Sequence, residues 1–186
     1  MSQLKILGLC GSLRKGSYNR MLLKLATEVA PADLSVESIE LGDIPFFDGD
    51  VFDKGYPASA AALRERIRAA DGVLIVTPEY NFTLSAVLKN AIDWASRGAD
   101  QPFVGKPLTV MSATQGPLGG ARVQYDVRRI MQFMQVFIMP RPETFVGSAA
   151  GKFNAEGQCT DEVTRKFVTE HMAAFRDWVV RMKKLG

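Results

Sequence analysis

Strand-like and helix-like patterns alternate along this chain. Short apolar runs, typical of strands buried in a parallel sheet, fall at residues 4–10, 72–77, 107–113 and 136–140, and a more mixed run falls at 34–41. Apolar residues at helical spacing fall at 19–30, 57–71, 84–97, 121–135 and 161–184. Five strands that each lead into a helix predict an α/β fold, with a parallel sheet covered by helices on both faces.

Length and composition fit one ordinary domain, which we expect to span residues 1–186. The chain is 47% hydrophobic and 23% charged, and its net charge is +3. This charge is small and scattered, and no basic run or zinc-ligand spacing is present, so a nucleic acid partner is not expected. No apolar stretch is long enough for a membrane span. The two cysteines, Cys10 and Cys159, lie far apart in the sequence, which favours a reducing, cytoplasmic location.

Three polar, glycine-rich loops follow the first, third and fourth predicted strands. They read "GSLRKGSYNR", "PEYNFT" and "TQGPLGG". Ligands of open parallel sheets bind beyond the carboxyl ends of the strands, near the point where the strand order reverses. We therefore expect the functional site where these three loops meet.

The first loop is suited to a small anion. It leads from the first predicted strand into the first predicted helix, and the start of a helix presents unpaired N–H groups that can bind an anion. Ser12, Ser17 and Asn19 can add side-chain donors, and Arg14 can add a charge-assisted bond. The loop lacks the lysine of a triphosphate-binding loop, and the dinucleotide pattern of three glycines is absent, so a monophosphate fits best. The alternative is that these residues only form a turn and a helix cap.

Together the three stretches resemble one known family. "GSLRKGSYNR", "TPEYNFTLSAVLKNAIDWASR" and "GPLGGARVQYDVRR" are similar to the NADPH-dependent FMN reductases, and most of all to the bacterial NAD(P)H:quinone reductases also called chromate reductases. The similarity runs from the first strand to the fifth and fades after Gly147. It implies a flavodoxin-like three-layer sandwich with a five-stranded parallel sheet in the order 2-1-3-4-5, which binds FMN non-covalently.

The resemblance implies a set of FMN-binding residues. The first loop holds the phosphate, the second borders the flavin ring and the third completes the pocket. The predicted residues are Ser12, Arg14, Ser17, Asn19, Pro78, Glu79, Tyr80, Asn81, Phe82, Thr114 and Gly116. The alternative for Tyr80 and Phe82 is core packing beneath a loop.

The resemblance also implies an activity and an assembly. NADPH or NADH passes a hydride to FMN, and a quinone takes two electrons in a ping-pong cycle; chromate, azo dyes and ferric chelates are further acceptors. No catalytic side chain and no metal are expected, because the flavin supplies the chemistry. Arg122, Tyr125 and Glu143 match residues that join subunits of a tetramer, so a homo-oligomer, dimer or tetramer, is expected. Phe82 stands where close relatives often have tyrosine, which removes one hydroxyl from that contact.

Three other functions stay open from the sequence. One is a flavodoxin-type electron carrier, although such carriers are usually strongly acidic. Another is a flavin reductase that releases reduced FMN to a partner. The third is a phosphate-binding regulatory domain without flavin.

Overall fold

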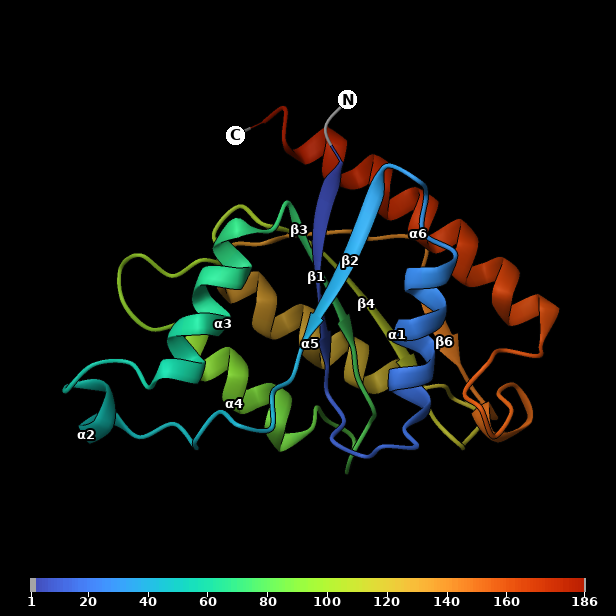
Figure 1. Ribbon diagram of the computed structural model, residues 1–186, viewed down its shortest axis with the longest axis horizontal. Coiled ribbons are helices and arrows are strands. Elements are labelled where there is room, and N and C mark those ends of the chain that lie inside the picture. The colour runs from blue at the N-terminus through green and yellow to red at the C-terminus, as the bar shows by residue number, and fades with distance from the viewer. Residues whose placement is uncertain (1–2, 186) are drawn as a thin grey trace.

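A computed structural model describes residues 3–185 and contains one sheet with its covering helices (Figure 1). The strands are β1 (Leu4–Cys10), β2 (Leu34–Ile39), β3 (Gly72–Val76), β4 (Pro107–Ala113), β5 (Phe137–Ile138) and β6 (Thr144–Val146). The helices are α1 (Tyr18–Glu28), α2 (Gly49–Phe52), α3 (Ala58–Ala69), α4 (Ala86–Ala95), α5 (Ala121–Phe133), α6 (Glu162–Met182) and the short 3-10 helix η1 (Ala149–Gly151).

The strand order confirms the predicted fold class. The order is β2-β1-β3-β4-β5, every pair is parallel, and β6 also pairs with β4. The order reverses at β1, since β2 lies on one side of it and β3 on the other. Strands β1, β3 and β4 are parallel neighbours whose carboxyl ends lie towards the lower edge in Figure 1, so the loops that follow them start from the same edge of the sheet.

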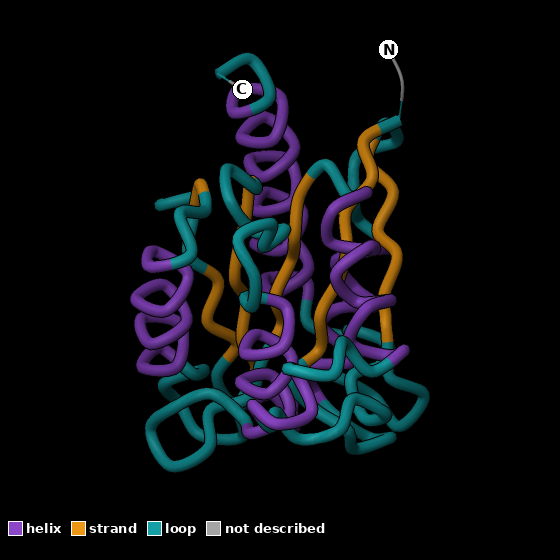
Figure 2. The backbone as a smooth tube through the Cα atoms, turned by 90° about the vertical axis from the view of Figure 1, so that its left-hand side faces the viewer, coloured by secondary structure: helices purple, strands orange, loops and turns teal. Residues whose placement is uncertain are grey.

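Alternation along the central strands supplies a core on each face of the sheet. Leu7 and Leu9 of β1 pack in one cluster with residues of α3, α4 and α5, whereas Ile6 packs in the other with residues of α1 and α6. Figure 2 shows helices on either side of the strands. Buried apolar side chains on both faces hold the sheet rigid, so its lower edge is a fixed platform for loops.

The fifth strand differs from its prediction. The apolar run at 136–140 predicts one strand, but β5 pairs only Phe137 and Ile138 with the start of β4, and β6 pairs with the end of β4. Pro140 and Pro142 separate the two pieces. Proline has no N–H to donate, so the ladder cannot run through this stretch.

The connection after β2 is a second feature that the pattern did not predict. It contains the short helix α2, and buried Asn90 of α4 fixes it by accepting from Phe47 N (2.7 Å) and donating to Pro45 O (2.9 Å). The indole N–H of Trp94 also donates to Pro45 O. Two side chains of α4 therefore order a long loop by binding its backbone.

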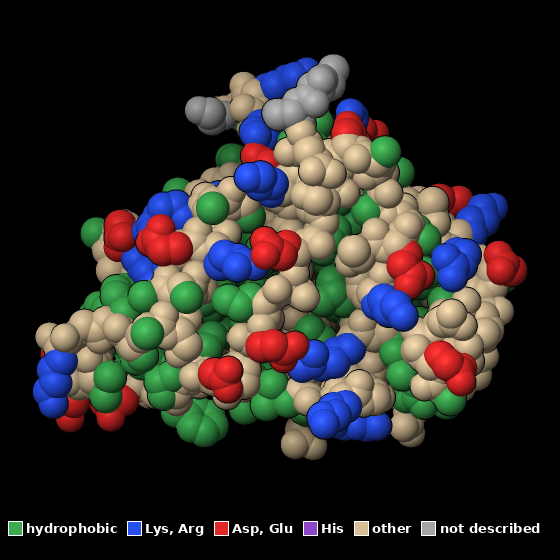
Figure 3. All heavy atoms as spheres, viewed as in Figure 1, with side chains coloured by type: hydrophobic (Ala, Val, Ile, Leu, Met, Phe, Trp, Pro, Cys, Tyr) green, Lys and Arg blue, Asp and Glu red, His purple; other side chains and the backbone are tan. Residues whose placement is uncertain are grey.

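The surface carries mixed charge. Figure 3 shows acidic and basic side chains interspersed over this face, and hydrophobic side chains gathering along its lower edge. Within residues 3–185, no helix has the length and apolar character needed to cross a membrane.

Candidate functional site

A cavity of about 190 Å³ lies between the three loops at the lower edge of the sheet. The first loop, the second loop and the end of β4 with the start of the third loop all contribute to its wall. It is lined by Ser12, Arg14, Ser17, Tyr18, Asn19, Pro78, Glu79, Tyr80, Ala113, Thr114 and Gln115. Three segments that are far apart in the sequence therefore meet where the fold rule places a ligand.

The first loop presents a row of backbone donors. Among residues 3–185, the N–H groups of residues 12–18 have no hydrogen-bond partner. The Ser12 hydroxyl also lacks a partner within the described chain, although Ser12 is only 3% exposed. Successive unpaired N–H groups at the start of a helix form a concave site for an anion. Gly11 allows the loop to begin here, because a Cβ atom would lie 2.4 Å from Thr77 Oγ1.

Ser17 and Asn19 have structural roles at this wall. Ser17 is the N-cap of α1, and its hydroxyl accepts from Asn19 N at 3.2 Å. Asn19 accepts from Ala113 N and donates to Ala113 O, both at 2.9 Å. The Asn19 side chain therefore ties the start of α1 to the end of β4, and one amide hydrogen is left for a ligand.

Two arginines of the first loop region face different partners. Arg20 donates to both carboxylate oxygens of Glu40 at 2.6 Å and to Ser12 O at 3.2 Å, so its donors are largely occupied. Arg14 is exposed and has no such partner among residues 3–185. Of the two, Arg14 is the cation free to meet an anion in the cavity.

The second loop ends in a tight hairpin. Tyr80 and Thr83 exchange two backbone hydrogen bonds of 3.0 Å, and Asn81 and Phe82 between them have φ values of 49° and 71°. Positive φ at both central residues is typical of a type I′ turn, where Asn-Gly is the preferred pair. A phenylalanine at the second position of such a turn is strained, and nothing in the sequence pattern predicted this turn.

Glu79 connects the second loop to α5. Its side chain is 7% exposed, and its carboxylate accepts from Arg122 Nε at 2.6 Å and from Val123 N at 3.2 Å. A carboxylate on an N–H group of the first turn stabilises the start of that helix. The Arg122 guanidinium in turn lies over the Phe82 ring, 3.8 Å from its centroid.

The third loop depends on glycines for its path. Gly119 and Gly120 have φ values of 61° and 82°, and a Cβ atom on Gly119 would lie 2.6 Å from Phe145 C. The Thr114 hydroxyl donates to Gly116 O at 3.0 Å. Gly116 is exposed, and a Cβ atom there would meet nothing within 4 Å.

Eight of the eleven predicted residues line the cavity. They are Ser12, Arg14, Ser17, Asn19, Pro78, Glu79, Tyr80 and Thr114. Asn81, Phe82 and Gly116 lie outside it, the first two at the hairpin tip. Core packing does not explain Tyr80 and Phe82, which are 48% and 68% exposed. Three further residues line the cavity that the sequence did not predict, Tyr18, Ala113 and Gln115, and each directly neighbours a predicted residue.

The three candidate interface residues do not meet within one chain. Arg122 pairs with Glu79, and Glu143 lies 3.8 Å from Arg128 Nε. Tyr125 is 59% exposed on the outer face of α5.

His171 is fully buried, and its two ring nitrogens contact the hydroxyls of Thr109 and Thr144 at 2.7 and 2.8 Å. Burial and the nearby Arg128 charge lower the His171 pKa from 6.5 to about 3.

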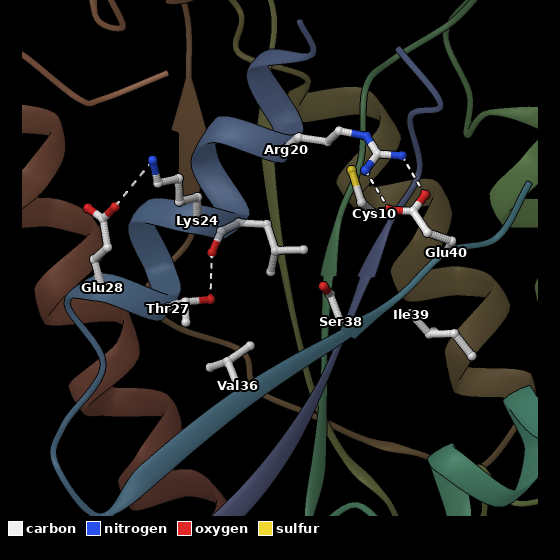
Figure 4. Close-up of a pocket in the computed structure, with 10 residues that line it drawn as sticks. Cys10, Arg20, Lys24, Thr27, Glu28, Val36, Ser38, Ile39 and Glu40 are labelled. Atoms are coloured by element: carbon white, nitrogen blue, oxygen red, sulfur yellow. Dashed lines mark hydrogen bonds and ion pairs between the residues drawn. The ribbon is translucent and has the colours of Figure 1, made fainter. Parts of the chain in front are cut away.

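A larger hollow of about 400 Å³ lies beside α1 and β2 (Figure 4). Its charged side chains neutralise one another: Arg20 pairs with Glu40, and Lys24 lies 3.9 Å from Glu28. The Cys10 thiol faces it, and burial raises the pKa of this thiol. No charged group of this hollow is left without a partner in the described chain, so its size alone does not make it the functional site.

Comparison with known proteins identifies relatives over most of the chain. The model of the family described as NADPH-dependent FMN reductase matches residues 4–151. An NAD(P)H-dependent FMN reductase of Pseudomonas aeruginosa is 42% identical over 180 residues, which cover 97% of each chain. A quinone reductase of Escherichia coli is 42% identical over 184 residues, covering 97% of this chain and 98% of the relative.

A solved structure agrees with the fold. The chain is similar to the flavoenzyme NAD(P)H:(acceptor) oxidoreductase FerB of Paracoccus denitrificans, with a TM-score of 0.89 and 34% identity. The match covers 96% of this chain and 98% of that one. The match therefore extends beyond residue 151, where the family model ends.

Proposed function

Because the chain belongs to the NADPH-dependent FMN reductase family, we propose that it holds FMN between its three loops. The activity follows from its relatives: it is an FMN-dependent oxidoreductase that passes electrons from NAD(P)H to quinones. The resemblance inferred from the three loop motifs is thereby confirmed, and so is the expected cofactor pair of FMN and NAD(P)H.

The proposed FMN site rests on one observation, the row of unpaired N–H groups in the first loop. Seven consecutive N–H groups, at residues 12–18, and the Ser12 hydroxyl have no partner in the described chain. Residues 13–16 of this row are exposed to solvent, whereas Ser12 and Ser17 are 3% and 4% exposed beside the cavity, and buried donors are rarely left without a ligand or water. A phosphate has enough acceptor oxygens to use several of them, and Arg14 adds a countercharge.

The cavity suits only part of FMN. Its volume of about 190 Å³ is below the roughly 300–1,000 Å³ of pockets that enclose whole ligands. We therefore assign the phosphate and the sugar chain to the cavity, and the flavin ring to the rim. Pro78, Glu79, Tyr80 and Asn81 would border the ring from one side, and Thr114 and Gly116 from the other.

The cofactor, when bound, accepts a hydride from NAD(P)H and passes two electrons to the acceptor. The chain's own residues bind and orient it. The rigid edge of the sheet fixes the three loops, and Asn19 couples the phosphate loop to the end of β4. The half-exposed Tyr80 offers an aromatic surface beside the cavity without sealing it, which leaves room for NAD(P)H and a quinone in turn.

An anaerobic titration tests this function. The purified protein, reconstituted with FMN, is mixed with NADPH and then with benzoquinone while its absorption spectrum is recorded. Bleaching by NADPH and recovery with the quinone are expected. A flavin that NADPH does not bleach would favour an electron carrier, and loss of the flavin during turnover would favour a supplier of reduced FMN.

The assembly and the location are further proposals. We propose a homo-oligomer, a dimer or tetramer, with Tyr125 and Glu143 at the contact, because Tyr125 is an exposed aromatic on α5. Arg122 is a weaker candidate for that contact, since it is engaged by Glu79 of its own chain.

We also propose that the chain is one domain, since both cores share a single sheet. We propose a cytoplasmic location, since both cysteines are free thiols.

A further inference from the structure

The first loop is held from behind by one arginine, Arg20. This residue lies in the first turn of α1, and its Nε donates to Ser12 O at 3.2 Å. The Cys10 thiol contacts the same oxygen at 3.8 Å. Arg20 and Cys10 line the hollow beside β2, whereas Ser12 lines the cavity between the three loops (Figure 4). Ser12 therefore separates the two, with its carbonyl directed to the hollow.

Arg20 is itself fixed by Glu40. Its Nη1 and Nη2 donate to the two carboxylate oxygens at 2.6 Å each, which is a bidentate pair. These hydrogen bonds raise the pKa of the Arg20 guanidinium and lower the pKa of the Glu40 carboxyl, so the pair stays ionised. The register of the sheet places Glu40 here, because it follows Ile39, the last residue of β2, which pairs with Leu9 of β1. The edge of the sheet therefore holds the guanidinium at Ser12 O.

The direction of the Ser12 carbonyl determines the direction of a donor. The peptide bond between Ser12 and Leu13 is trans, and in a trans peptide the C=O and the following N–H point in opposite directions. Because Arg20 holds the Ser12 C=O towards the hollow, the Leu13 N–H points away from the hollow. This N–H is one of the seven in the first loop that have no partner in the described chain. A charged donor on the carbonyl also polarises the peptide, which makes its N–H a stronger donor.

We propose that Arg20, held by Glu40, is a positioning residue for the cofactor: it orients and polarises the Ser12–Leu13 peptide so that the Leu13 N–H donates to the phosphate of FMN. This inference rests on the proposed function, because it takes the phosphate to lie at the first loop. Arg20 acts through the backbone and is not among the residues that line the cavity. Its role therefore differs from that of Arg14, the exposed cation on the cavity side.

A simple effect of charge predicts a different result. A guanidinium near a phosphate also raises its affinity by attraction alone, without orienting any donor. Glu40 would then oppose Arg20, since its carboxylate repels the phosphate and neutralises the guanidinium. In the proposed arrangement Glu40 supports binding, because it holds the guanidinium at Ser12 O. Neutralising Glu40 therefore changes the affinity for FMN in opposite directions under the two explanations.

Equilibrium titration of the flavin-free full chain tests the role of Arg20. The Kd for FMN and the Kd for riboflavin, which lacks the phosphate, are measured for the unmodified protein, Arg20→Met and Glu40→Gln. Arg176→Met is the matched control, since the Arg176 side chain is 28% exposed against 32% for Arg20, and its Nε and Nη2 donate to Asp33, outside the first loop. Urea unfolding measures the stability of each variant separately.

We expect Arg20→Met to weaken FMN binding by about tenfold, the effect of one lost hydrogen bond to the phosphate, and to leave the riboflavin Kd within about twofold. Glu40→Gln should weaken FMN binding by about threefold, because a neutral amide holds the guanidinium less firmly than a carboxylate does. Arg176→Met should change neither Kd. A phosphate-specific loss in both loop variants, with none in the control, would support the inference.

An unchanged FMN Kd in Arg20→Met would overturn the inference, and so would equal losses for FMN and riboflavin, which a merely structural role of Arg20 predicts. Tighter FMN binding in Glu40→Gln would assign the effect to charge alone and would also overturn it. The Glu40 side chain is 65% exposed, so this variant provides the test even if Arg20→Met does not fold. Equal affinity of the unmodified protein for FMN and riboflavin would instead refute the proposed phosphate site, on which the inference rests.

Discussion

Arg14 and Ser17 lie on the same loop but contribute to it differently. Arg14 is exposed, lines the cavity and has no ion-pair partner in the described chain, so its guanidinium is available to bind a ligand. Ser17 already caps α1 through Asn19 N. Their residue types pointed to a phosphate site, but only the structure separates the ligand-facing group from the helix cap.

The double variant Arg14→Ala with Ser17→Ala tests the phosphate assignment. It should weaken FMN binding by about 2–4 kcal/mol, since it removes one charge-assisted and one neutral hydrogen bond. Arg14→Ala alone should leave the unfolding free energy of the apoprotein unchanged, whereas Ser17→Ala should lower it by about 1 kcal/mol through the lost cap. Fluorescence titration with FMN and urea unfolding measure the two effects. Lys184→Ala, at the end of the chain away from the loops, is the control, and full FMN affinity in the double variant would contradict the assignment.

Phe82 gives a second prediction, about backbone strain. Phe82→Gly relieves a left-handed residue, which is worth about 1–2 kcal/mol, and loses an exposed cation–π contact of about 0.5–1 kcal/mol. Glycine also costs about 0.5–1 kcal/mol of chain entropy, so its unfolding free energy should stay within about 1 kcal/mol of the original. Phe82→Ala keeps the strain and loses the contact, so it should be the less stable of the two in urea. An alanine variant more stable than the glycine variant would show that the turn is not strained.

Most of the predicted site residues line the cavity, and they could be predicted because they lie close in sequence to predicted strands. Eight predicted residues line the cavity because their loops directly follow predicted strands, in the order that the family resemblance implied. The contacts of Glu79 and Arg122 could not be predicted in the same way, because these residues are far apart in the sequence and meet only after α5 packs beside the second loop. The backbone strain at Phe82 could not be predicted either. The pair Asn81-Phe82 lacks the glycine that usually marks a turn with positive φ angles.

Helix α1 and strand β4 are coupled by a single side chain. Asn19 makes two hydrogen bonds of 2.9 Å to Ala113, at the last residue of β4. Both partners are buried, so no water replaces the lost bonds when the side chain is removed.

Asn19→Ala should therefore destabilise the protein by about 2–4 kcal/mol and weaken FMN binding as well, since the phosphate loop leads into α1. Urea unfolding and FMN titration measure both. Ser35→Ala is the control, because its half-buried hydroxyl makes one bond of 3.2 Å at the far end of β1, and it should cost under about 1 kcal/mol. A loss for Asn19→Ala no larger than this would show that the coupling is weak.

The elements themselves were predictable to the extent that their apolar pattern was continuous. The runs at 4–10 and 107–113 are strands with the predicted bounds. The run at 136–140 is not, because prolines interrupt it and the chain rejoins the sheet only at Thr144–Val146. The helix α2 has only four residues, too few for a periodic pattern, and the loop before it is held by the side chains of Asn90 and Trp94.

The buried His171 joins three elements of the whole fold, and it carries a pH prediction. It lies on α6 between Thr109 of β4 and Thr144 of β6, with a pKa lowered from 6.5 to about 3. Below pH 6.5 the unfolded chain binds a proton that the folded chain does not, so stability falls as the pH falls from about 6.5 towards 3. Between pH 7 and pH 5 the loss should be about 2 kcal/mol.

Urea unfolding at the two pH values, with His171→Gln as the comparison, measures this loss. The variant has no titrating group at this position, so its stability should change much less between pH 7 and pH 5. The carboxylates with lowered pKa values, such as Asp33 and Asp71, titrate below 3.8 and so lie outside this window. An equal loss in the variant would assign the pH dependence to other groups.

The whole molecule is a parallel sheet covered by helices, which the alternation of strands and helices predicted, and three polar loops line a cavity at its carboxyl edge. The central untested claim is that the first loop binds the phosphate of FMN. The most direct measurement compares the Kd of the apoprotein for FMN with its Kd for riboflavin, which has the same ring and sugar chain but no phosphate. The account predicts that FMN binds at least about a hundredfold more tightly, since several charge-assisted hydrogen bonds depend on the phosphate. Equal affinity for the two flavins would show that the donors at residues 12–18 do not hold it.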